Sequence, residues 1–169
     1  MLGFVRRNLR VNSKSSKEQA YKMLVRPKVE YAAAVWDPYT ADHINTLEKI
    51  QRRAARVVCN DHHKTSSVTA MLKVLNWPSL QSRRRASRLT TLFKIKECKV
   101  KIRTEHLKPA PARSRRGHNQ QYARPQCKKD VRLNSFFPRT IKDWNALTQN
   151  DVSAPSADAF HRRVLLSGG

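Results

Sequence analysis

The stretch LEKIQRRAARVVCN, residues 47–60, limits the fold more than any other part of the sequence. On a helix of about 3.6 residues per turn, its apolar side chains fall on one side: Leu47, Ile50, Ala54, Val57 and Val58. The other side carries cations: Lys49, Arg52, Arg53 and Arg56. Such a helix has to bury its apolar side against other helices, so the pattern predicts a helical bundle with a cationic outer surface.

The same two-sided pattern recurs in SLQSRRRASRLTTLFKIKE, residues 79–97. Its apolar side holds Ala86, Leu89, Leu92 and Phe93, and its cations point broadly away from them: Arg83, Arg84, Arg88 and Lys94. Two such helices are expected to pack through their apolar sides and to line a groove with their cations. A second interpretation stays open, in which Glu48 pairs with Arg52 along its own helix and the other cations merely solvate the surface.

Most of the chain follows helical periodicity, which predicts a mainly α fold, a helical bundle over residues 1–107. Capping residues and prolines delimit the helices: 17–25 after Ser15 or Ser16, a continuation past Pro27 to near Pro38, 41–59 after Thr40, 67–75 after Ser66, and 78–97 from Pro78.

A small C-terminal segment, residues 131–169, is expected to dock on this bundle. Val131 and Leu133 alternate with polar neighbours and predict a short strand. Helices follow from Pro138 and after Ser156. The expected anchors are aromatic: Phe136, Phe137, Trp144 and Phe160.

Residues 108–130 differ from both of these parts. The run KPAPARSRRGHNQQYARPQCKK combines prolines, amides and cations with few aliphatic side chains, which predicts a basic, flexible loop. Arg113, Arg115 and Arg116 could clamp phosphates or act as a nuclear localisation patch. An inert linker is an equally open interpretation.

The charge balance predicts a polyanionic partner. Lys and Arg number 35 against 12 Asp and Glu, which gives a formal net charge of +23 and a pI near 11.0. Cations spread along a whole chain favour nucleic acid over a membrane surface, which is usually met by one helix or a short polybasic segment. The longest apolar run, residues 31–36, is far below the roughly 20 residues of a membrane span, and the scattered, odd-numbered cysteines are typical of an intracellular chain in nucleus or cytoplasm.

Residues that carry out chemistry are scarce. Acidic residues are isolated, and the sequence contains no phosphate-binding glycine motif and no GxSxG elbow, so we expect no catalytic residue and no small-molecule substrate. In CNDHH, Cys59, His62 and His63 lie close together, but a structural zinc site usually needs a second ligand pair. No metal site and no cofactor are therefore predicted.

The order of several strings resembles the C-terminal part of jockey-like non-LTR (LINE-type) retrotransposon polyproteins. These strings cover the chain from Leu2 to about Leu165: LGFVRRNL, AYKMLVRPKVEYAAAVWDPY, LEKIQRRAARVV, SSVTAMLKVLNWPSLQSRR and RLNSFFPRTIKDWNAL. Departures from the family pattern include His62 and His63, where an aromatic residue is common.

The resemblance implies a helical thumb and the segment that follows it in a reverse transcriptase. In that family the thumb grips the template and primer, while a palm with paired aspartates, absent from this chain, holds Mg²⁺ and performs nucleotidyl transfer. The expected partner is the backbone of RNA, an RNA–DNA hybrid or DNA, without preference assigned. A helical protein-interaction module and a degenerate retroelement relic stay open, as does the oligomeric state.

Overall fold

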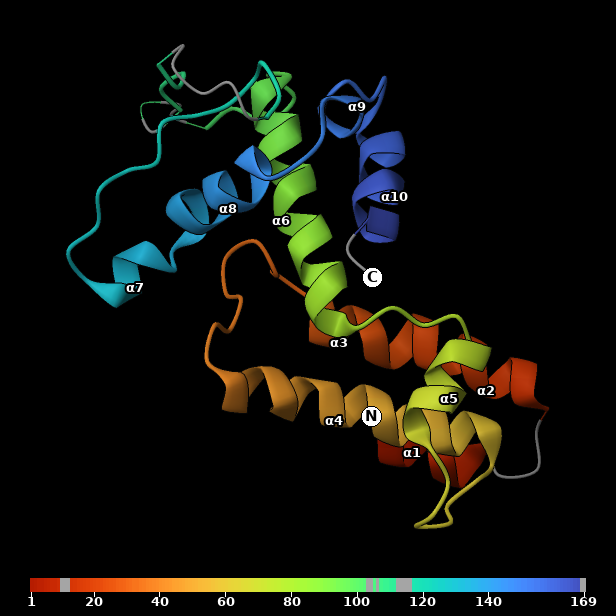
Figure 1. The fold of residues 1–169 in the computed structure, drawn as a ribbon. Helices are drawn as coiled ribbons and strands as arrows, with labels where there is room; N and C mark the ends of the chain where they lie inside the picture. Colours follow the sequence, from red (N-terminus) through yellow and green to blue (C-terminus); the bar gives the residue numbers. More distant parts are fainter. Residues whose placement is uncertain (10–12, 103–104, 106, 112–116, 168–169) are drawn as a thin grey trace. The chain divides into compact units, whose positions relative to one another are not determined.

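A computed structural model describes residues 1–9, 13–102, 105, 107–111 and 117–167 of the chain. The described residues are mainly helical, so the predicted mainly α fold class is confirmed (Figure 1). Extended pairing among them is limited to an isolated antiparallel bridge between Pro109 and Tyr122.

The chain divides into two compact units, which are described separately. The first unit comprises Met1–Ala32 and Pro38–Arg83, and the second comprises Ala33–Asp37 and Arg84–Gly169. Helix α6, Leu80–Lys96, contributes its first residues to the first unit and the remainder to the second. The division at residues 107 and 130 that the sequence suggests stays a prediction.

The other helices of the first unit are α1 (Leu2–Asn8), α2 (Lys14–Ala20), η1 (Tyr21–Val25), α3 (Arg26–Glu30), α4 (Ala41–Cys59) and α5 (Val68–Val74). Helix α4 has the predicted bounds after Thr40, and Asn60 ends it in the left-handed conformation with φ 52°. Of its predicted apolar side, Ala54, Val57 and Val58 are buried, and Leu47 and Ile50 are half-buried.

The helical run from α2 to α3 differs from the prediction at both ends. Ser13, rather than Ser15 or Ser16, caps it, and its hydroxyl accepts the N–H of Ser16 at 3.3 Å. Pro27 is tolerated because the preceding turn, η1, is a wider π-helix, which accommodates a residue that has no N–H and a bulky ring.

The predicted continuation of this helix to near Pro38 is wrong. The helix ends at Glu30; Tyr31 is extended, with ψ 134°, and Ala32 is left-handed, with φ 51°. Asp37 explains why the chain leaves the helix. Its carboxylate is paired with Arg84 and Arg88, and all three residues belong to the second unit. Tertiary contact thus overrides the local preference of an alanine-rich stretch.

The core of the first unit contains a series of hydrogen bonds between neutral polar groups. The Tyr21 ring stacks on Trp77 with centroids 4.4 Å apart, and its hydroxyl donates to Gln51 Oε1 at 3.3 Å. Gln51 Nε2 in turn donates to the Pro78 carbonyl at 2.8 Å. Burial raises the pKa of Tyr21, so the phenol stays a neutral donor.

The second unit packs the later part of α6 against α8 (Phe136–Asn145) and α10 (Ala157–Ser167), with α7 (Asp130–Leu133) and α9 (Gln149–Val152) beside them. Trp144 is fully buried at its centre, with its ring 5.6 Å from that of Phe160. Phe93 stacks on Phe160 at 4.7 Å. Trp144 and Phe160 are therefore anchors of this core, whereas Phe136 and Phe137 are only half-buried.

The strand predicted at Val131 and Leu133 is wrong, because these residues form the short helix α7. Val131 is 75% exposed, so the alternation does not reflect a buried face. The Asn134 side chain donates to the Asp130 carbonyl at 2.9 Å and closes this helical turn locally.

The described parts of segment 108–130 contact helix α8. His118 is buried, with its Nε2 2.9 Å from the Trp144 carbonyl oxygen, and the Trp144 indole N–H donates to the Gln120 carbonyl at 2.8 Å. Asn145 bonds to both backbone groups of Tyr122. These partners come from α8, far along the sequence, and the predicted flexible loop over 108–130 stays a prediction.

Candidate functional site

Three cations of α4 form an exposed surface, which we call the α4 basic face: Lys49, Arg52 and Arg53. Their spacing of three and four residues places them side by side on one side of the helix. The structure gives them no ion-pair partner among the described residues. Their charges are therefore available to an external anion.

The alternative in which Glu48 neutralises Arg52 is not what the structure shows. Glu48 Oε1 instead accepts the backbone N–H of Gln81 at 3.0 Å, at the start of α6. A carboxylate is favourable at this position because the first N–H groups of a helix have no partner within it. Glu48 therefore stabilises the junction of α4 with α6, and Arg52 has no ion-pair partner in the part of the chain that the structure describes.

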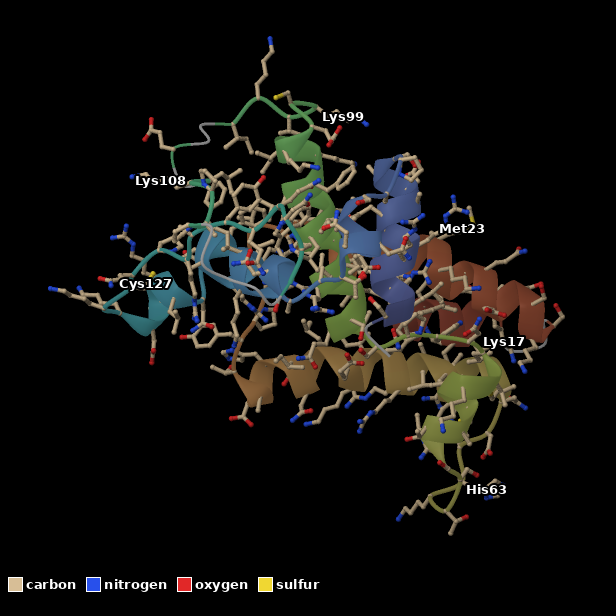
Figure 2. The ribbon with its side chains drawn as sticks, turned by 45° about the horizontal axis from the view of Figure 1, so that its top comes forward. Lys17, Met23, His63, Lys99, Lys108 and Cys127 are labelled. Carbon is tan, nitrogen blue, oxygen red and sulfur yellow. The ribbon has the colours of Figure 1, made fainter. Side chains whose placement is uncertain are left out.

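Arg56, the fourth cation of this helix, is half-buried and holds the loop between α4 and α5. Its Nη1 donates to the His63 carbonyl at 2.7 Å and its Nη2 to the Ser66 carbonyl at 3.4 Å. Asp61 accepts hydrogen bonds from Ser66 Oγ and His63 N, and these bonds lower the pKa of Asp61. Figure 2 shows His63 at the tip of this loop.

The arginines of α6 have acidic partners, in contrast to the cations of the α4 basic face. Within the first unit, Arg83 forms a bidentate ion pair with Glu30, in which Nη2 lies 3.0 Å from Oε2. This pairing raises the pKa of the Arg83 guanidinium. Arg83 is therefore neutralised by its own chain.

Arg84 and Arg88 lie inside the second unit, with only 2% and 3% of their surface exposed. Asp37 forms ion pairs with both of them: Oδ1 accepts a hydrogen bond from Arg84 Nε at 2.9 Å, and Oδ2 lies 2.9 Å from Arg88 Nε. Arg139 Nη1 adds a third contact to Asp37 Oδ2 at 3.2 Å, and Arg88 Nη2 also reaches Asp143 Oδ2 at 3.0 Å. We call this set the buried ion cluster.

The expectation that Arg84 and Arg88 bind nucleic acid is corrected by this cluster. Arg84 also lies over the Trp36 ring, 4.1 Å from its centroid, and donates to the Trp36 carbonyl. Moving either guanidinium to a phosphate would remove one of the three cations that compensate the charge of Asp37, which is costly for a buried carboxylate. The remaining arginines of the prediction, Arg113, Arg115 and Arg116, lie outside the described residues.

The fold brings cations of α1 and α2 to α4, and no local pattern in the sequence predicts this. Arg6, Arg7 and Lys17 line a hollow together with Val57, Asn60 and His62. The doublet of arginines in α1 was visible in the sequence. Its position next to α4 was not, because it depends on how the first unit packs.

The described residues contain no group of three or more His, Cys, Asp or Glu side chains that could hold a metal ion. In this part of the chain no helix is long and apolar enough to cross a membrane.

Comparisons of the chain with protein-family models, with curated proteins and with solved structures give no match.

Proposed function

We propose that the chain binds the sugar–phosphate backbone of nucleic acid through the α4 basic face, without catalysing a reaction. The observation that carries this proposal is the exposure of Lys49, Arg52 and Arg53 without an ion-pair partner among the described residues. The overall charge of +23 adds a long-range attraction for a polyanion. Such contacts to phosphates position a protein on nucleic acid but carry little sequence information.

The ordered strings from LGFVRRNL to RLNSFFPRTIKDWNAL support a more specific form of the proposal. In this form the chain is the thumb and downstream segment of a reverse transcriptase of the jockey-like non-LTR retrotransposons. Helix α4 then grips the template–primer duplex for a palm that lies elsewhere in the protein.

The carboxylates of this chain do not suit the Mg²⁺ ions of that polymerase. Asp37 and Asp143 are bonded to arginines, and Glu30 is bonded to Arg83. A pair of metal ions needs several carboxylates close together and free of such partners. We therefore assign no nucleotidyl-transfer step to this chain.

The proposal is tested by fluorescence anisotropy with labelled duplexes of unrelated sequence, prepared as RNA, RNA–DNA hybrid and DNA. At physiological salt we expect a Kd in the non-specific range, about 10⁻⁴ to 10⁻⁶ M, that is similar for all sequences. The triple variant Lys49→Gln, Arg52→Gln, Arg53→Gln should bind at least about tenfold more weakly. Absence of binding at low salt, or a Kd that depends strongly on base sequence, would contradict the proposal.

A further inference from the structure

The first unit contains a cationic hollow between α1 and α4, next to the α4 basic face. Its larger part has a volume of about 640 Å³ and is lined by residues of α1, α2, α4 and the loop after α4: Gly3, Arg6, Arg7, Lys17, Val57, Asn60 and His62. A second part shares Gly3, Arg6, Val57 and His62 and adds Leu2, Arg53 and Arg56. We call the two parts together the α1–α4 groove.

Lys17 is the least exposed cation of this groove. Its side chain is buried, with 7% of the residue exposed, yet it has no hydrogen-bond or ion-pair partner among the described residues. Its Nζ is not one of the described buried polar atoms that lack a partner, so the stem of Lys17 is buried while its ammonium opens into the groove. An anion in the groove would supply the missing partner.

The remaining lining fits the same conclusion. Neither described part of the groove is lined by a carboxylate, while Arg6, Arg7 and Arg53 add guanidinium groups. Arg7 Nη1 lies 3.6 Å from the position that a Cβ on Gly3 would take, so the guanidinium lies directly over the glycine in the groove wall. The positive charge of these side chains is therefore concentrated along the α1–α4 groove.

We infer that the α1–α4 groove binds a phosphate dianion, as presented by a 5′-phosphorylated strand end or by free inorganic phosphate. Planar guanidinium groups match the oxygens of a phosphate in pairs, and a terminal phosphate carries nearly two negative charges at neutral pH. An internal phosphodiester carries only one charge and must continue on both sides, which suits the open α4 basic face better than a hollow. Arg53 belongs to both surfaces and connects them.

The strand-end form of this inference rests on the proposed nucleic-acid function, so the experiment has one arm without nucleic acid. The full chain is titrated with inorganic phosphate, against chloride at matched ionic strength, and binding is followed by NMR of the Lys17 and arginine side chains. In the second arm, the same single strand is compared with a 5′-phosphate and with a 5′-hydroxyl. The wild-type chain should prefer the phosphorylated strand by about tenfold, the change that one charge-assisted hydrogen bond produces.

Two variants should remove this preference while leaving binding of the 5′-hydroxyl strand unchanged. Lys17→Met keeps the buried stem and removes the charge, and Lys14→Met, an exposed lysine of the same helix, is its matched control. Gly3→Leu favours helix α1 and places a side chain in the groove, which tests occupancy even if Lys17→Met weakens the fold.

The outcomes separate the inference from the proposed function. Saturable binding of inorganic phosphate that Gly3→Leu abolishes supports the site, and an added preference for the phosphorylated strand identifies the strand end as its source. If phosphate binds but the 5′-hydroxyl strand does not bind even at low salt, the site stands and the proposed function fails. Equal affinity for both strands, together with no effect of phosphate beyond that of chloride, would overturn the inference.

Discussion

Helices α4 and α6 carry similar runs of arginine opposite an apolar side, yet the structure uses the two runs in opposite ways. Arg52 and Arg53 of α4 are exposed and unpaired among the described residues, whereas Arg84 and Arg88 of α6 are almost fully buried. The difference comes from the acidic partners. Asp37 and Asp143 neutralise the arginines of α6 from distant parts of the sequence, so a basic stripe indicates a binding surface only where no such acid reaches it.

The two units also differ in how they satisfy buried polar groups. The first unit uses the neutral chain Tyr21–Gln51–Pro78, and the second uses the buried ion cluster around Asp37. A neutral hydrogen bond contributes little net stability, whereas breaking a buried ion pair leaves an uncompensated charge. The two interiors should therefore respond differently to equivalent substitutions.

The largest effect is expected from Asp37→Asn, which removes the negative charge that Arg84, Arg88 and Arg139 share. We expect the free energy of unfolding to fall by about 3–5 kcal/mol, the cost of removing one partner of a buried ion pair. Urea denaturation measures this loss. Asp158→Asn, at an exposed position in the first turn of α10, is the matched control and should change stability by less than about 1 kcal/mol. Equal stability of the two variants would show that the cluster is not a buried ionic network.

A related pair of variants compares the two helices directly. Arg84→Gln should cost several kcal/mol, because it leaves Asp37 with less compensation, whereas Arg53→Gln should stay within about 0.5 kcal/mol as a surface substitution. Thermal unfolding of the two variants side by side measures the difference. A large loss of stability in Arg53→Gln would mean that the α4 basic face contributes to folding, and would contradict the distinction between the arginines of α4 and those of α6.

An intermediate effect is expected from Gln51→Leu in the first unit. The substitution keeps the volume of the side chain but leaves the Tyr21 hydroxyl and the Pro78 carbonyl without their partner. We expect a loss of about 1–3 kcal/mol, the cost of unsatisfied buried polar groups. Gln19→Leu, at an exposed position of α2, is the control in the same denaturation experiment. A loss as large as that of Asp37→Asn would remove the distinction between neutral and ionic interiors.

The smallest effect concerns Glu18, which binds Lys22 at 2.6 Å and the Trp77 indole N–H at 3.1 Å. The hydrogen bond from Lys22 lowers the pKa of Glu18 from its ordinary value of 4.5, and the bond from Trp77 adds to this. A lowered folded-state pKa means that the contribution is present above about pH 4.5 and is lost as the pH falls through the folded-state value.

We therefore expect wild type to lose up to about 0.5 kcal/mol relative to Glu18→Gln on acidification, a range typical of exposed pairs. Denaturation of both proteins between neutral pH and pH 3 measures this difference. A gain of wild-type stability relative to the variant in acid would contradict the assigned partners.

The sequence was sufficient to predict helices that are determined by their own residues. It was insufficient where contacts with distant residues determine the structure. Helix α4 has the predicted bounds and buried side because its apolar periodicity is a property of its own residues. The burial of Arg84, the end of α3 at Glu30 and the position of His118 against Trp144 depend on contacts between residues far apart in the sequence. The strand pattern at Val131 failed for a different, local reason, because Val131 is exposed and Asn134 closes the α7 turn on Asp130.

The central claim, that the α4 basic face binds the phosphate backbone, is tested most directly by the dependence of duplex affinity on salt. Each phosphate that a cation neutralises contributes about −0.9 to the slope of log K against log salt concentration on B-form duplex. The comparison uses wild type, the triple variant at Lys49, Arg52 and Arg53, and a control with Lys73, Lys94 and Lys142 changed to Gln, which loses the same charge from exposed positions elsewhere. We expect the slope to flatten by about two to three in the α4 variant and to change little in the control. An unchanged slope in the α4 variant, or equal flattening in both, would contradict the account.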